Sequence, residues 1–128
     1  SQYRNVSILG YHPEAKIQLR LSGIGQIHEE GSTADQAWEQ ASLFGRRCYL
    51  ADPAPGSAVD EATSGLPSEL EGQKPTAEQV VPARANFAVL LVDVHRIEWL
   101  YLAHTGHRRA YSSWDAEIRV WQHHWLVP

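Results

Sequence analysis

Two groups of polar side chains in this sequence could bind a ligand, and they lie far apart along the chain. Gln18 and Arg20 alternate with apolar residues, whereas Arg109 closely follows a turn at Thr105-Gly106. A side-chain amide offers both a donor and an acceptor, and a guanidinium fork matches phosphate or carbonyl oxygens. Surface roles compete with this hypothesis, because Gln18 could lie on the solvated face of a strand and Arg109 in an exposed hairpin. For Arg20, a solvated or interface charge is the favoured interpretation.

The histidine, cysteine and glycine patterns give less support to other chemistries. His123 and His124 are adjacent on an expected strand, so their side chains point to opposite faces and joint metal chelation is not expected. Cys48 lies beside a helix end without the sequence context of a nucleophile. The Gly23-x-Gly25 pair lacks the further glycine and the strand-to-helix context of a phosphate-binding loop. We therefore predict no metal site.

The composition describes one small domain. The chain has 128 residues, of which 43% are hydrophobic, and this is enough for a core within a single domain. The formal net charge of −4 argues against a nucleic-acid or membrane-surface role, because such roles use a basic excess. The single cysteine excludes an intramolecular disulfide and suits a reducing cytosol, so a cytoplasmic location is expected.

The start of the chain also carries information. The sequence has no Met and begins in the middle of a pattern. No apolar run approaches the length of a membrane span, and no secretory signal segment is visible. We expect residues 1–128 to form a single domain that is the C-terminal part of a longer polypeptide.

Alternating apolar and polar residues predict several strands. Residues 5–11 carry Val6, Ile8 and Leu9, and residues 16–22 follow a period of two that is typical of a half-buried antiparallel strand. Gly23 and Gly25 are expected to interrupt the second strand at a bulge or a barrel corner. Residues 86–95 are apolar on both faces, which predicts a central strand covered on both sides. Together these strands fit a small antiparallel barrel.

One helix and one long irregular segment are expected between these strands. Ser32 or Thr33 is the predicted N-cap of a helix that finishes near Gly45. From residue 52 to 85 the sequence is rich in Pro, Gly, Ser and Glu, which predicts a flexible insertion. At most a short helix is expected there, over residues 78–81.

The last 32 residues have the pattern of three strands joined by two tight turns, at Thr105-Gly106 and around Asp115-Ala116. Four of the five tryptophans of the chain follow residue 98, more than the core of a small barrel needs. Aromatic side chains are enriched at protein interfaces. We therefore predict that some of these tryptophans pack across a dimer interface: Trp99, Trp114, Trp121 and Trp125.

This C-terminal region resembles the signature of the pyridoxamine 5′-phosphate oxidase-like, FMN-binding split-barrel family. Three segments carry the resemblance in the family's order: Ile97-Glu98-Trp99, His107-x-Arg109 after a hairpin one residue shorter, and Trp121 to Pro128. Residues 17–23 are similar to the family's Arg-Gln-Val-Arg-Val-x-Gly strand. The resemblance extends over nearly the whole chain, but it covers only the C-terminal half of the family's pattern.

The resemblance implies a mostly β fold, a split barrel with one or two helices, and FMN bound at the interface of a homodimer. It implies cofactor contacts from Gln18, Arg109, Trp99 and Ser57 and substrate contacts from His107 and Arg47. Two departures weaken the inference that pyridoxamine phosphate is oxidised: Thr105 stands where the family has a substrate-gripping arginine, and Trp125 replaces a terminal arginine. At Leu100 this chain also lacks the family's flavin-site tryptophan.

The resulting hypothesis is an FMN-dependent oxidoreductase that acts on a small molecule, with no nucleic-acid or membrane partner. The flavin would carry the hydride chemistry, and the protein would supply position and electrostatics. A non-catalytic flavin- or haem-binding module is the alternative, since one fold hosts many functions.

Overall fold

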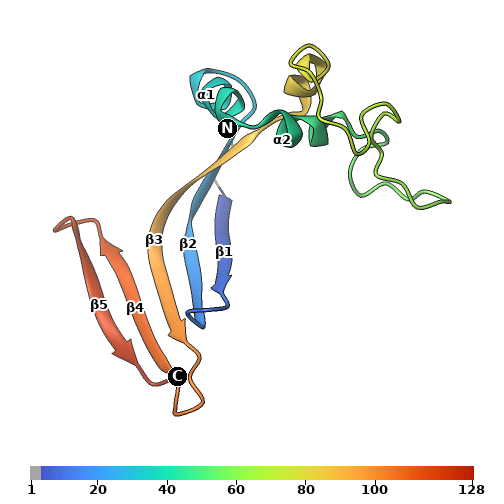
Figure 1. Cartoon of the computed structure of the whole chain (residues 1–128). Helices are drawn as coiled ribbons and strands as arrows, with labels where there is room; N and C mark the ends of the chain where they lie inside the picture. Colours follow the sequence, from blue (N-terminus) through green and yellow to red (C-terminus); the bar gives the residue numbers. More distant parts are fainter. Residues whose placement is uncertain (1–3) are drawn as a thin grey trace. The chain divides into compact units, whose positions relative to one another are not determined.

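The computed structural model describes residues 4–128 and consists mainly of one β-sheet with a few short helices (Figure 1). The elements follow in the order β1 (Arg4–His12), β2 (Ile17–His28), α1 (Ser32–Gln40), α2 (Leu43–Arg47), β3 (Val89–Tyr101), β4 (Arg108–Asp115) and β5 (Val120–Leu126). Two 3₁₀ helices, η1 (Cys48–Leu50) and η2 (Val81–Asn86), precede β3. Over the described residues, no helix is both long and apolar enough to cross a membrane.

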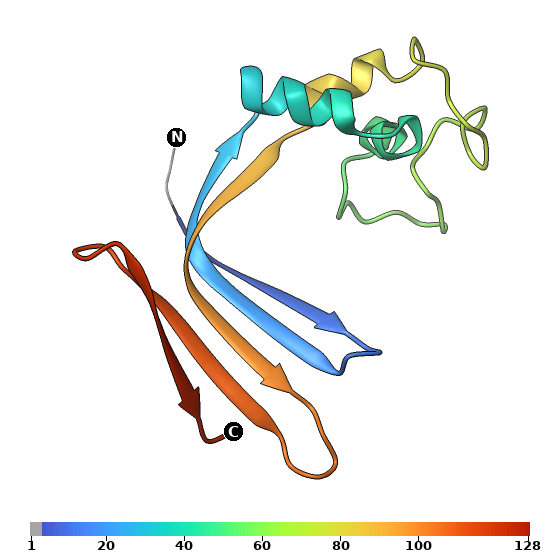
Figure 2. The ribbon, with the colours of Figure 1, turned by 60° about the vertical axis from the view of Figure 1, so that its left-hand side comes forward.

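The five strands form one open sheet in the order β1-β2-β3-β4-β5. β1 pairs antiparallel with β2, and β3, β4 and β5 form an antiparallel meander, which Figure 2 shows from a second side. The mostly β fold and the three C-terminal strands were predicted correctly. In the part of the chain that the structure describes, the sheet does not close into a barrel.

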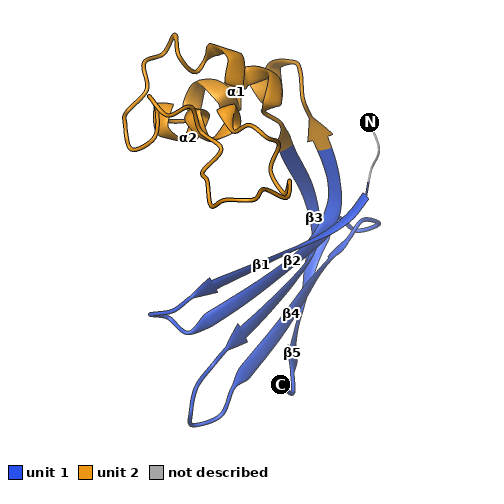
Figure 3. Ribbon diagram, turned by 90° about the vertical axis from the view of Figure 1, so that its right-hand side faces the viewer, with its two compact units in different colours: residues 1–26, 90–128 blue, residues 27–89 orange. Residues whose placement is uncertain are grey.

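The chain divides into two compact units (Figure 3). Unit 1 contains residues 1–26 and 90–128, and unit 2 contains residues 27–89. β2 and β3 lead from one unit into the other. Each unit is described separately below.

The predicted interruption of β2 at its two glycines is wrong, because the strand runs without a break from Ile17 to His28. Gly23 and Gly25 are both buried. A Cβ atom on Gly23 would overlap with the backbone carbonyl of Asp93, and one on Gly25 would lie 2.9 Å from a methyl group of Val6. The glycines therefore allow neighbouring strands of unit 1 to approach closely, and they do not end the strand.

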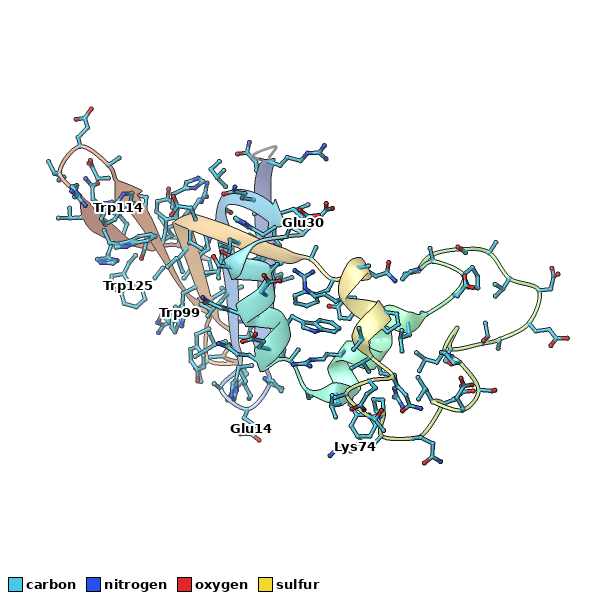
Figure 4. The ribbon with its side chains drawn as sticks, turned by 90° about the horizontal axis from the view of Figure 1, so that it is seen from above. Glu14, Glu30, Lys74, Trp99, Trp114 and Trp125 are labelled. Carbon is cyan, nitrogen blue, oxygen red and sulfur yellow. The ribbon has the colours of Figure 1, made fainter. Side chains whose placement is uncertain are left out.

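Paired strands in unit 1 place their four tryptophans on one face, which we call the aromatic face. Residues opposite one another in a ladder share a face, and side chains alternate between faces along each strand. Trp99 pairs with Ala110, which pairs with Trp125, and Trp114 pairs with Trp121. The rings of Trp99 and Trp125 lie 6.1 Å apart, and those of Trp114 and Trp121 lie 5.8 Å apart. Figure 4 shows Trp99, Trp114 and Trp125 along this part of the sheet.

Much of the apolar surface of unit 1 is exposed. Trp125 is 74% exposed, and Leu90 and Leu91 of β3 are 51% and 47% exposed. β3 is the middle strand of the sheet, as predicted, but the expectation that it is covered on both faces is wrong for this chain. A strand that is apolar on both faces is buried only where further layers pack on the sheet.

Unit 2 contains two short helices where the sequence predicts one. Gly31 occupies the N-cap position of α1 without a side-chain cap, so the prediction of Ser32 or Thr33 as N-cap is wrong. The chain leaves the helical conformation at Ala41. Ser42 then caps α2, because its Oγ accepts a hydrogen bond of 3.1 Å from the backbone N–H of Gly45. This cap satisfies a backbone N–H in the first turn of α2 and so stabilises the start of the second helix.

The segment over residues 52–85 is irregular, as predicted, apart from η2 at its end. The short helix expected at 78–81 lies slightly later and is of the 3₁₀ type. Leu70 and Val80 from this segment are buried. Arg47 also holds it, because its Nη1 donates hydrogen bonds of 2.7 Å to the carbonyls of Leu70 and Gln73. The flexibility of the segment stays a prediction.

Candidate functional site

The candidate site is a pocket of about 320 Å³ in unit 1. Glu98, Leu100 and Arg109 of its lining lie on the face of β3 and β4 opposite the aromatic face, which we call the polar face, and Trp99 of the aromatic face also lines the pocket. Its lining combines residues from β2, β3 and β4 with the turn before β4 and the last residue of the chain: Gln18, Arg20, Glu98, Trp99, Leu100, His107, Arg109 and Pro128. The pocket therefore joins polar groups that are distant in sequence.

Strand alternation and register place these side chains together. Gln18 and Arg20 are two residues apart in β2, so they share a face, and the same holds for Glu98 and Leu100 in β3. Leu100 pairs with Arg109 in β4. Gln18 and Arg109 are half-buried, whereas Arg20 is exposed.

Glu98 is the electrostatic centre of the pocket. Its Oε2 accepts a hydrogen bond of 2.8 Å from Nη2 of Arg109, and its Oε1 accepts one of 2.8 Å from Nη2 of Arg96. The hydrogen bond from Arg109 is the main cause that holds the pKa of Glu98 below its ordinary value of 4.5. Partial burial acts in the opposite direction, and the charges of Arg96, Arg109 and Arg20 lower the pKa further. Glu98 is therefore an anion at neutral pH.

His107 belongs to the turn that leads into β4. Its Nδ1 accepts a hydrogen bond of 3.1 Å from the backbone N–H of Ala103, which closes the turn. Gly106, with a φ of 124°, provides the left-handed conformation that this turn requires. Because Nδ1 acts as the acceptor, the proton of the neutral ring is on Nε2. His107 can therefore offer a donor at the pocket.

Of the six residues predicted to bind a ligand, the structure brings four into this pocket: Gln18, Trp99, His107 and Arg109. Arg47 and Ser57 belong to unit 2. There Arg47 binds the backbone carbonyls of Leu70 and Gln73, and the backbone N–H of Ser57 donates to the carbonyl of Ala54. Ser57 also lines a separate pocket of about 250 Å³ within unit 2.

The sequence-based selection left out two charged residues that line the pocket, Glu98 and Arg20. Glu98 belongs to the Ile97-Glu98-Trp99 segment, but the resemblance implies no ligand contact for it. Alternation would have identified it, because Glu98 and Leu100 share a face of β3 and Leu100 pairs with Arg109. A carboxylate diagonally across from an arginine on adjacent strands is a predictable ion pair.

The chain matches known proteins in its structure. No family model matches the chain, and no curated protein sequence matches it. The structure is similar to the crystal structure of a pyridoxamine 5′-phosphate oxidase-related, FMN-binding protein from Nostoc punctiforme PCC 73102, with a TM-score of 0.66 and 21% identity over 95% of this chain. It is also similar to PhzG from Burkholderia lata 383 in complex with tetrahydrophenazine-1-carboxylic acid, with a TM-score of 0.58 and 20% identity over 95% of this chain.

The chain shares its fold with these two proteins. This finding confirms the fold that the sequence resemblance implied. The chain spans 62% of the length of the first protein and 58% of the second, which is less than two thirds of either.

Proposed function

We propose that this chain binds FMN, with the pocket on the polar face as part of the flavin site, and that it serves flavin-dependent redox chemistry on a small molecule. The observation that carries the proposal is the meeting of Gln18 and Arg109 in one pocket. They are two of the four residues to which the sequence resemblance assigns flavin contacts; Trp99 also lines this pocket, and Ser57 does not. The description of the Nostoc protein as FMN-binding and the shared fold support the proposal.

The donors and acceptors in the pocket fit a flavin ring. The amide of Gln18 can donate to a ring carbonyl or nitrogen and accept from a ring N–H. Arg109 and the Nε2–H of His107 add donors, and Trp99 adds an aromatic surface. A volume of about 320 Å³ is at the lower end of the range for small-molecule sites, so the rest of the nucleotide would extend beyond the pocket.

When bound, the flavin supplies the hydride and electron chemistry, and the protein supplies orientation and electrostatics. Gln18 and Arg109 bind and orient the ring in this proposal. Trp99 excludes water from one side, and His107 holds a proton on Nε2 that a substrate acceptor can use. The proposed substrate is a small molecule, and the PhzG structure likewise holds a small molecule, tetrahydrophenazine-1-carboxylic acid.

A homodimer in the cytoplasm is part of the proposal. Contiguous apolar patches on a monomer are usually small, and larger ones commonly mark interaction sites. Trp125 is 74% exposed and lies on the aromatic face, and the neighbouring Val127 is 91% exposed. We expect a second copy to cover some of the tryptophans there. A monomeric sedimentation profile at micromolar concentration would contradict this part of the proposal.

The flavin site is tested by comparing two arginine substitutions, Arg109→Ala and Arg20→Ala. Loss of a charge-assisted contact costs about 1.5–3 kcal/mol, which corresponds to about one to two orders of magnitude in affinity. Arg109→Ala should weaken FMN binding by this factor. Arg20→Ala, which removes an exposed charge from the same pocket, should weaken it less. Quenching of FMN fluorescence measures both affinities, and circular dichroism checks that each variant is folded.

Equal FMN affinities for the two variants would reject the assignment of Arg109. Absence of FMN binding by the unchanged protein would reject the proposed function itself. The absorption spectrum of the purified protein distinguishes the alternatives, since flavin and haem have different visible bands.

A further inference from the structure

We infer that Glu98 is a positioning residue for the pocket: its carboxylate holds the guanidinium of Arg109 in place before any ligand binds. The inference rests on the proposed function, because Arg109 is the arginine assigned to the flavin. It goes beyond that function by giving Glu98, which makes no assigned flavin contact, a role that acts through Arg109.

The register of β3 and β4 makes this contact direct. Glu98 pairs with Tyr111, and Arg109 is two residues from Tyr111 on the same face of β4. Glu98 and Arg109 are therefore diagonal neighbours, within reach of long side chains. The hydrogen bond of 2.8 Å between Oε2 and Nη2 has the length of a charge-assisted bond.

A second arginine fixes the carboxylate itself. Nη2 of Arg96 donates to Oε1 of Glu98 over 2.8 Å. The guanidinium of Arg96 lies over the ring of Tyr111, 4.7 Å from its centroid. Both oxygens of Glu98 are thus engaged, and the carboxylate cannot rotate without losing a hydrogen bond. The carboxylate that accepts the hydrogen bond from Arg109 is therefore itself fixed by Arg96.

The exposures of the three side chains explain why Glu98 does the holding. The Glu98 side chain is 15% exposed, whereas Arg109 is 36% and Arg96 is 46% exposed. An arginine at this exposure would sample several rotamers if it had no partner, and a ligand would then have to restrict it on binding. A guanidinium that is ordered in advance loses less freedom, so the ligand binds more tightly. Four of the donor groups of Arg109 remain after the one given to Glu98.

The test is a double-mutant cycle with FMN as the probe. Glu98→Gln keeps the shape of the side chain but removes its charge, so the FMN affinity should fall about tenfold. If Glu98 acts through Arg109, the pair Glu98→Gln with Arg109→Ala should bind FMN within about a factor of two of Arg109→Ala alone. Glu117→Gln, which alters a carboxylate in the exposed β4–β5 turn, is the matched control and should leave the affinity unchanged.

Additive losses in the cycle would overturn the inference, because Glu98 would then affect FMN independently of Arg109. The same holds if Glu98→Gln binds FMN as tightly as the unchanged protein. Both results leave the assignment of Arg109 intact, since that is tested by Arg109→Ala alone.

A second measurement needs no flavin and keeps the inference testable if FMN does not bind. In the ¹⁵N–¹H NMR spectrum of the flavin-free protein, the Nη–H signals of Arg109 should be resolved and slow to exchange. They should broaden or disappear in Glu98→Gln, and their assignment follows from their loss in Arg109→Lys. Identical Arg109 signals in the unchanged protein and in Glu98→Gln would overturn the inference.

Discussion

The regular sheet of unit 1 and the irregular chain of unit 2 differ in where their apolar residues go. Four of the five apolar residues that are buried among the described residues belong to unit 2: Ala34, Leu70, Val80 and Ala83. Unit 1 contributes Ala103, although it contains most of the strand residues. The aromatic rings of Trp38, Tyr49 and Phe87 also pack together in unit 2, with centroids 5.2–6.3 Å apart.

This difference shows that backbone regularity and burial have separate causes. A sheet forms when alternating residues let neighbouring strands pair, and pairing satisfies the backbone whether or not a face is covered. Burial needs a second layer. In unit 2, the irregular segment and the short helices provide that layer for one another. In unit 1, by contrast, the neighbouring strands approach closely at Gly23, and the hydrogen bonds of Glu98 link Arg96 and Arg109 on the polar face.

The largest effect is expected in unit 1, from adding a single methyl group to Gly23. In Gly23→Ala the new Cβ would overlap with the carbonyl of Asp93 and lie 2.9 Å from a methyl group of Val92, so β2 and β3 must move apart. We expect the free energy of unfolding to fall by about 3 kcal/mol, at the upper end of typical overpacking costs. Urea denaturation measures this change.

Gly10→Ala is the matched control in the same sheet, because nothing lies within 4 Å of the position of its Cβ. Its stability should be unchanged or higher by up to about 1 kcal/mol, since alanine is favoured over glycine within a strand. Similar stabilities for the two variants would show that the approach of β2 to β3 does not constrain the sheet.

A smaller effect is expected in unit 2, from removal of the arginine that binds the irregular segment. Arg47→Ala loses two short hydrogen bonds to the carbonyls of Leu70 and Gln73. We expect a loss of about 2 kcal/mol, because hydrogen bonds to charged groups are among the stronger ones. The backbone amides of residues 66–80 should exchange hydrogen faster, because the hydrogen bonds from Arg47 to this segment are lost.

Lys74→Ala serves as the control for Arg47, since Lys74 is an exposed cation in the same segment. It should leave the exchange rates unchanged. If Arg47→Ala also left the exchange rates unchanged, the packing of Leu70 and Val80 would be enough to order this segment without the hydrogen bonds of Arg47.

The smallest effect is expected at the helix caps of unit 2. Ser42→Ala removes the hydroxyl that accepts from the N–H of Gly45, and loss of such a cap costs about 1 kcal/mol. Ser32→Ala alters the serine that the sequence predicted as a cap but that caps nothing in the structure, so it should have little effect. Thermal unfolding compares the two variants, and a larger loss for Ser32→Ala would contradict the cap assignment.

The sequence by itself predicted those features that depend on neighbouring residues. Apolar residues before a turn predicted β1, alternation predicted the start of β2, and turn residues predicted the β3-β4-β5 meander. Local composition predicted the irregular segment before β3. The resemblance in residue order also selected Gln18, Trp99, His107 and Arg109, which share one pocket.

Only the tertiary structure decided the features that depend on partners distant in sequence. Gly23 is of a residue type that often interrupts strands. In the structure it lies within β2, because the backbone of Asp93 approaches too closely for a side chain. Glu98 became part of the site because the β3–β4 register places it beside Arg109. A sequence fixes local preference, but the choice between competing hydrogen-bond partners is made by the chain segments that folding brings together.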